Sequence, residues 1–126
     1  MFTHIMVGTN DAPAAKAFYD GVMGALGHGE GMLMNEGAAV LYRTETGMFM
    51  ATTPRNGEPA THANGGTIGL FAASPAVVDA AHAAGLAAGG TCEGEPGPRD
   101  IMPGAYGAYL RDPTGNKICL WHMAAG

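Results

Sequence analysis

The segment YGAYLRDPTGNKICLWH, residues 106–122, contains two strand patterns joined by one tight turn. Pro113 presets φ at the second position of the turn, and Gly115 accepts a positive φ at its own position. Asp112, which opens the turn, is therefore expected to bond the turn itself rather than a metal ion. The segment predicts two neighbouring strands near the end of the chain.

The same succession of patterns occurs twice along the chain. Residues 3–11, THIMVGTND, alternate in the manner of a strand and end in a helix-start signal, and residues 12–26 then change to three- and four-residue apolar spacing. Residues 66–74, GTIGLFAAS, repeat the strand, and residues 76–88 repeat the helix. An offset of 63 residues superimposes the two copies.

Three short strands are expected after each helix. They cover residues 31–35, 38–44 and 47–53 in the first half, and residues 91–95, 104–111 and 116–123 in the second. A four-stranded half cannot both bury its helix and close its sheet edges, whereas two halves can form a curved eight-stranded sheet around a cavity. The sequence therefore predicts an α+β fold of two βαβββ modules. We expect a single domain over residues 1–126, with module one at 1–53, a Pro- and Gly-rich linker at 54–65 and module two at 66–124.

Composition limits the possible partners. The chain has 126 residues, of which 47% are hydrophobic and 13% charged, and this is typical of one globular domain. The net charge of -5 argues against nucleic acid and against an anionic membrane surface, because no basic stripe is available. The start of the chain has no signal-peptide pattern, so we expect a cytoplasmic protein in which Cys92 and Cys119 are reduced thiols.

Several motifs together resemble one superfamily. They are HIMV with Asp11, AFYDGVMGALG at 17–27, PGPR at 96–99 and YGAYLRDPTGNKI at 106–118. The chain resembles the vicinal oxygen chelate superfamily, which contains glyoxalases, bleomycin-resistance proteins and ring-cleaving dioxygenases, and within it the lactoylglutathione-lyase-like branch. The resemblance implies a glyoxalase-like fold that binds a small molecule. It also implies a homodimer, or a chain that packs its two halves against each other.

Metal-dependent members of this superfamily take four His, Glu or Gln ligands from the first and last strands of each half. Carried over to this sequence, the four positions are His4, Ala51, Thr67 and Cys119. Only His4 is a standard ligand, so the sequence disfavours a divalent metal and leaves the cofactor open. His4 and Cys119 could still hold a soft ion such as zinc, with His62 of the linker as a third ligand.

The candidate site residues follow from strand alternation. His4 and Cys119 are the candidate catalytic residues, and His4 is the candidate metal ligand. The expected substrate-binding residues are Phe49, Ala51, Thr67, Phe71 and Trp121. His122 is expected on the opposite face from Cys119, which disfavours a Cys–His dyad, and His28 and His82 are expected on the surface.

Two functions remain open from the sequence. The first is an enzyme of the glyoxalase type, a lyase or isomerase in which His4 polarises a carbonyl or moves a proton. The second is a non-catalytic protein that binds or sequesters a small molecule, as bleomycin-resistance proteins do, with Phe49 and Trp121 stacking on a planar ligand.

Overall fold

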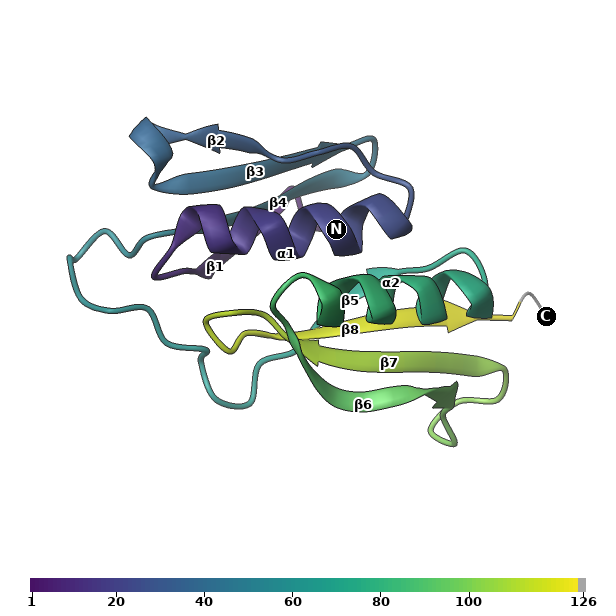
Figure 1. The fold of residues 1–126 in the computed structure, drawn as a ribbon. Helices are drawn as coiled ribbons and strands as arrows, with labels where there is room; N and C mark the ends of the chain where they lie inside the picture. Colours follow the sequence, from purple (N-terminus) through teal and green to yellow (C-terminus); the bar gives the residue numbers. More distant parts are fainter. Residues whose placement is uncertain (125–126) are drawn as a thin grey trace.

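The computed structural model describes residues 1–124 and contains two copies of one βαβββ arrangement (Figure 1). The first copy consists of β1 (His4–Gly8), α1 (Ala12–Ala25), β2 (Met32–Met34), β3 (Ala39–Thr44) and β4 (Gly47–Thr52). The second consists of β5 (Ile68–Phe71), α2 (Pro75–Ala87), β6 (Thr91–Pro98), β7 (Ala105–Arg111) and β8 (Lys117–Met123). A short 3₁₀ turn at Asn35–Gly37, which the sequence did not indicate, separates β2 from β3.

Both sheets have the same strand order. The first sheet runs β1-β4-β3-β2 and the second runs β5-β8-β7-β6. In each sheet the first strand pairs in parallel with the last, and the other pairs are antiparallel. The predicted α+β fold of two βαβββ modules is confirmed, and the eight strands divide into two hydrogen-bonded sheets of four.

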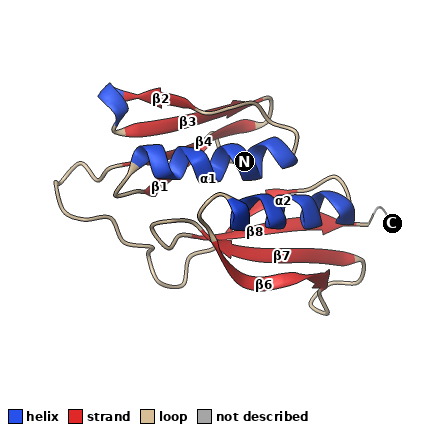
Figure 2. Ribbon diagram, in the orientation of Figure 1, coloured by secondary structure: helices blue, strands red, loops and turns tan. Residues whose placement is uncertain are grey.

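Both helices lie on the same side of the sheets and pack side by side (Figure 2). Each starts at the signal expected from the sequence, because the side chain of Asp11 accepts a hydrogen bond from the backbone N–H of Ala14 and that of Ser74 accepts one from Val77. The core fills the space between helices and sheets, and its largest side chains include Phe18, Tyr19, Tyr42 and Leu110. One face of each sheet is therefore covered and the other is open.

The turn at residues 112–116 joins the two modules. Asp112 is 5% exposed, and its carboxylate accepts bonds from three backbone N–H groups of the turn, at 2.9 Å each, and from the Asn116 side chain at 2.8 Å. The same carboxylate accepts a 2.6 Å bond from the hydroxyl of Tyr19 on α1, and Asn116 donates to the carbonyl of Gly8 on β1. Asp112 thus has the structural role expected from the sequence.

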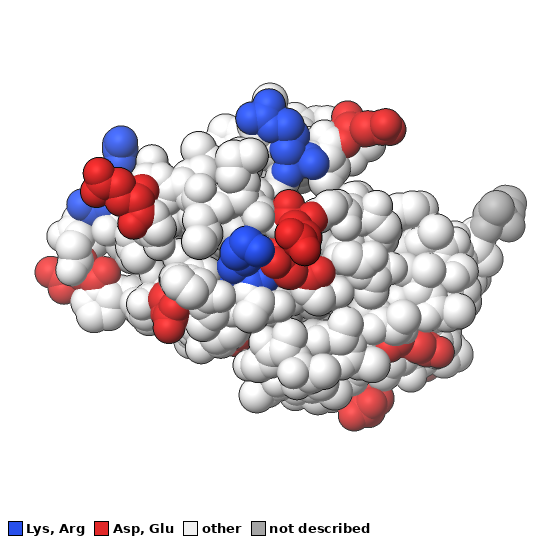
Figure 3. Space-filling model, turned by 45° about the horizontal axis from the view of Figure 1, so that its top comes forward, with Lys and Arg blue, Asp and Glu red and all other residues white. Residues whose placement is uncertain are grey.

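The surface agrees with the charge analysis. Lys, Arg, Asp and Glu are scattered over the face drawn in Figure 3, with broad uncharged areas between them and no continuous basic stripe. Within the described residues, neither helix is long and apolar enough to span a bilayer.

Candidate small-molecule site

The pairing of β1 with β4 decides which side chains of the first module face away from the helices. His4 lies opposite Met48, and Met6 lies opposite Met50, on the open face of the sheet. Ile5 pairs with Phe49 on the other face, which packs against α1.

Phe49 and Ala51 therefore do not point toward the open, cavity-bearing face of the sheet as was expected from the sequence. Phe49 is 5% exposed and Ala51 is fully buried, and both belong to the core beneath α1. The cause is a slip of one residue, because Ile5 pairs with Phe49 while Ile68 pairs with Ile118, so that Met50, not Ala51, corresponds to Cys119. A shift of one residue moves every side chain of a strand to the opposite face.

A first cavity, of ≈ 380 Å³, lies at the start of β1. Its lining includes Phe2, His4, Met48 and Phe71, and Phe49 borders it from the helix side. The imidazole Nδ1 of His4 lies 2.9 Å from the hydroxyl of Thr3. His4 is thus solvent-exposed and held by its chain neighbour.

A second cavity, of ≈ 430 Å³, lies on the open face of the second sheet. Four of the residues proposed from the sequence meet there: Thr67, Phe71, Cys119 and Trp121. Tyr109 completes the wall, and sequence reasoning missed it. Its position in the strand before the turn was a usable signal, because β7 and β8 pair so that Tyr109 lies directly opposite Cys119.

The two cavities flank β5 and share three residues of this strand, Gly69, Leu70 and Phe71. His4 lines only the first cavity and Cys119 only the second. The structure therefore does not bring the two candidate catalytic residues into one cavity of a single chain.

Burial controls the chemistry of Cys119. It raises the pKa of the thiol, and Tyr109, Arg99 and Lys117 lower this pKa by less than burial raises it. The thiol is therefore protonated at neutral pH and is a poor nucleophile. Tyr109 carries two cations near its ring, with Lys117 Nζ at 5.1 Å and Arg99 Cζ at 5.5 Å from the centroid.

The four positions that hold a metal in related proteins are occupied here by His4, Met50, Thr67 and Cys119. Together they offer one imidazole, one thioether, one neutral hydroxyl and one buried thiol, and none of them is a carboxylate or amide oxygen. A hard divalent ion needs anionic or strongly polar oxygen and nitrogen donors, and this set supplies one. The residues present do not fit the metal of the metal-dependent relatives.

The remaining histidines lie outside both cavities or at their margin. His122 contacts the carbonyl of Ala72 at 3.0 Å, on the face opposite Cys119 as predicted. His62 lies beside Gly115 in the turn rather than over a cavity mouth, and His28 borders the first cavity. The expectation of a surface position is wrong for His82, which is 4% exposed. The offset of 63 residues between the two copies indicates this burial, because it places His82 at the position equivalent to the fully buried Tyr19.

Paired βαβββ modules with open, cavity-bearing sheet faces define the glyoxalase-like class of folds. The family model for the Glyoxalase/Bleomycin resistance protein/Dioxygenase superfamily matches residues 1–120. The chain belongs to this superfamily.

Solved structures agree with this assignment. A glyoxalase/bleomycin resistance protein from Albidiferax ferrireducens T118 is 53% identical, with a TM-score of 0.91 over 98% of this chain and 99% of that one. A lactoylglutathione lyase from Agrobacterium tumefaciens is 25% identical, with a TM-score of 0.68 over 97% and 92%. A glyoxalase-related enzyme from Fulvimarina pelagi shares the fold, with a TM-score of 0.76 at 16% identity over 97% and 87%. No curated protein matches the chain.

Proposed function

We propose that this protein binds a planar, largely apolar small molecule in the second cavity without transforming it. The supporting observation is that Trp121, Phe71 and Tyr109 surround one open cavity of ≈ 430 Å³, with Thr67 and Cys119 as sparse polar points. Small-molecule sites combine mostly apolar walls with a few orienting polar groups in this way.

The charge around Tyr109 narrows the ligand class. Lys117 and Arg99 both lie against the ring of Tyr109, at the edge of the aromatic wall. A ligand that stacks on Trp121 could reach these cations with a carboxylate or another anionic substituent. We therefore favour an aromatic compound with one acidic group.

Catalysis has weaker support. The Cys119 thiol has a raised pKa, and Met50 and Thr67 supply no general base. Binding alone requires neither a nucleophile nor a general base, so it accounts for the cavity with fewer assumptions.

Fluorescence of Trp121, the only tryptophan of the chain, tests the proposal directly. Titration with a panel of planar aromatic acids should give saturable quenching. Tyr109→Ala should weaken binding by about fivefold or more, because an aromatic contact contributes about 1 kcal/mol beyond its buried area. Ile101→Ala is the matched control, since Ile101 is 83% exposed and lines neither cavity, and it should leave affinity unchanged. Absence of quenching across the panel would contradict the proposal.

A lyase or isomerase of the glyoxalase type is the second candidate function. The likeness to the lactoylglutathione lyase from Agrobacterium tumefaciens favours it. Conversion of a methylglyoxal–glutathione adduct should then be measurable and should be lost in His4→Ala. Turnover that needs added metal and His4 would replace pure binding as the function.

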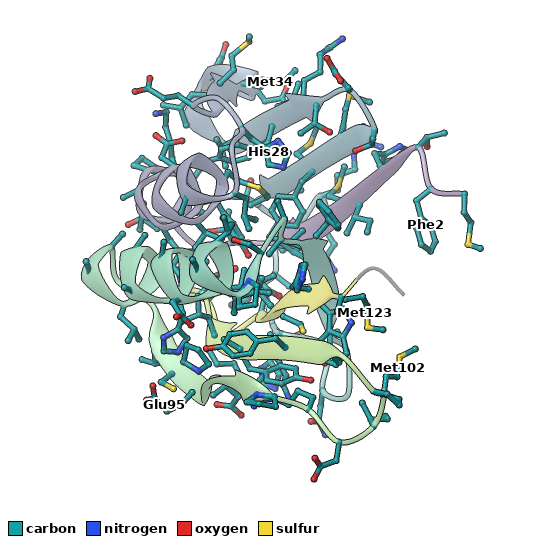
Figure 4. The ribbon with its side chains drawn as sticks, turned by 90° about the vertical axis from the view of Figure 1, so that its right-hand side faces the viewer. Phe2, His28, Met34, Glu95, Met102 and Met123 are labelled. Atoms are coloured by element: carbon teal, nitrogen blue, oxygen red, sulfur yellow. The ribbon has the colours of Figure 1, made fainter. Side chains whose placement is uncertain are left out.

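We further propose that two copies associate through the open sheet faces. Phe71 is 77%, Phe2 68% and Met6 52% exposed, which is unusual for large apolar side chains. Figure 4 shows Phe2 and Met123 on the side of the molecule away from the helices. Sedimentation should give a dimer that Met6→Lys weakens and Ile101→Lys does not, and a monomer at all concentrations would exclude this association.

A further inference from the structure

Three side chains with metal-binding atoms meet at the outer edge of the second module. His82 comes from α2, and Cys92 and Glu95 come from β6. His82 Nε2 lies 3.3 Å from Cys92 Sγ, which lies 3.3 Å from Glu95 Oε1, and the three atoms are all within 4.8 Å of one another.

Irregular pairing of β6 is what brings Cys92 and Glu95 together. Residues three apart in a regular strand point to opposite faces. Here Cys92 lies opposite Leu110 and Gly94 lies opposite Tyr109, so β6 contains one extra residue between these two pairs. This bulge reverses the alternation and turns both Cys92 and Glu95 toward α2.

His82 is the buried member of the cluster. It is 4% exposed. Its imidazole is hydrogen-bonded to a thiol, and such a weak hydrogen bond offsets little of the free-energy cost of burying an imidazole. Cys92 and Glu95 are exposed, so the cluster has an inner nitrogen donor and an open outer side.

Two of the three donor separations are close to those around a tetrahedral zinc ion. Zinc bonds of about 2.0–2.3 Å at tetrahedral angles place neighbouring donor atoms roughly 3.4–3.6 Å apart. Two of the three separations are 3.3 Å. Imidazole nitrogen, thiolate sulfur and carboxylate oxygen are all ligands that zinc accepts, and such three-ligand sites leave the fourth position to water.

A nucleophilic role for Cys92 has less support. Partial desolvation raises the pKa of this thiol, and the hydrogen bond to Glu95 raises it further. Reactive cysteines require the opposite shift. A bound cation would instead take the place of the thiol proton between sulfur and carboxylate.

We propose that His82, Cys92 and Glu95 form a zinc site, with its fourth position open to solvent. The site ties the edge strand β6 to α2. It is separate from both cavities, whose linings contain none of the three residues. Figure 4 shows Glu95 on β6, on the opposite side of the molecule from Phe2 and Met123.

Cobalt(II) is a spectroscopic substitute for zinc and tests the site without any activity assay. Titration of the full-length, metal-free protein should give one-to-one binding, with thiolate-to-cobalt charge-transfer absorption and the visible bands of a four-coordinate ion. Added Zn²⁺ should displace the cobalt. Cys92→Ser should abolish the charge-transfer absorption, and Glu95→Gln should weaken binding by about tenfold or more, since even residues behind the ligands can contribute that much.

Matched variants locate the ion. Cys119→Ser removes the only other thiol, and His4→Ala removes the candidate metal ligand of the first cavity, so both should retain the full cobalt spectrum. Zn²⁺ should also raise the thermal midpoint of the wild type and of Cys119→Ser but not that of Cys92→Ser. Circular dichroism of Cys92→Ser and Glu95→Gln, which change exposed side chains, verifies folding.

Two results would overturn the proposal. One is a wild-type protein without thiolate-to-cobalt absorption at cobalt concentrations above that of the protein. The other is absorption that disappears in Cys119→Ser but survives in Cys92→Ser, which would place the ion in the second cavity.

Discussion

The two modules share one backbone plan, yet their buried polar side chains have different partners. Tyr19 on α1 and His82 on α2 occupy equivalent positions, 63 residues apart, and both are buried. Tyr19 donates to Asp112 in the other module, whereas His82 contacts Cys92 within its own. The helical repeat determines which positions are buried, and the residue type at each position determines its hydrogen-bond partner.

The turns before the last strands show the same difference. In the second module, the Asp112 carboxylate accepts five hydrogen bonds and reaches the first module. In the first module, the corresponding turn depends on Thr44, whose hydroxyl donates to the carbonyl of Gly47 at 2.8 Å. The turn at Asp112 thus forms hydrogen bonds to both modules, whereas the turn at Thr44 forms them only within its own hairpin.

The largest effect is expected from Asp112→Ala. Loss of the carboxylate leaves the N–H groups of Thr114 and Asn116 and the Tyr19 hydroxyl without a partner, while the Gly115 N–H keeps the Asp112 carbonyl, so the free energy of unfolding should fall by about 3–5 kcal/mol. Thr44→Ala is the matched change in the other turn and should cost about 1 kcal/mol or less. Urea denaturation measures both. Equal losses would show that the two turns have equivalent roles.

A smaller effect is expected where Phe18 of the first module enters the second. A Cβ at Gly90 would lie 2.3 Å from Phe18 Cε1, so Gly90→Ala should cost about 2–3 kcal/mol through overlap. Gly27, at the equivalent sequence position, has no neighbour within 4 Å but has φ +99°, so Gly27→Ala should cost about 1 kcal/mol through backbone strain.

A second substitution separates these two causes. Phe18→Leu should recover part of the loss in Gly90→Ala and none of the loss in Gly27→Ala, as measured by a double-mutant cycle from thermal or urea unfolding. Strict additivity in both backgrounds would refute the overlap.

The smallest effect concerns Asp20, which ties α1 to the outer strands of the first module. Burial raises the pKa of Asp20, but bonds from Lys16, the Gly31 N–H and Tyr42 outweigh it, so this pKa is lowered. A lowered folded-state pKa stabilises the protein above the unfolded value, about 3.9, and this stabilisation disappears as the pH falls through the folded value.

Asp20→Asn should therefore cost about 1 kcal/mol at pH 7, and this cost should shrink as the pH falls below the unfolded value of about 3.9. Urea midpoints across this pH range measure the difference. A gap between variant and wild type that stays constant with pH would contradict the assigned role of the charge.

Local patterns allowed much of the fold to be predicted. Both helices and all eight strands lie where spacing and turn residues indicated, and the structure selects Asp11 over Asn10 as the first helix cap and has Ser74 as the second. The family assignment is confirmed as well, while the domain limits, the catalytic roles of His4 and Cys119 and the location in the cell stay predictions. These successes rest on signals contained within about ten residues of chain.

The incorrect or missing predictions depend on strand register and on β-bulges, which local sequence patterns do not reveal. The orientation of Phe49 and Ala51 depends on where β4 begins to pair with β1, and an error of one residue reversed it. The cluster around Cys92 depends on an extra residue in β6, which no periodicity reveals. Grouping Thr67, Phe71, Cys119 and Trp121 succeeded because β5 and β8 pair without irregularity.

The side-chain hydrogen bonds between the modules are concentrated at one end of the molecule. Within residues 1–124, those bonds join the turn at 112–116 to Tyr19 or to the stretch from Gly8 to Asn10. The first cavity lies at the opposite end of β1, near Phe2 and Phe71, and none of these hydrogen bonds involves a residue of its lining. The end held by these hydrogen bonds should therefore keep the two modules together more firmly than the end beside the first cavity.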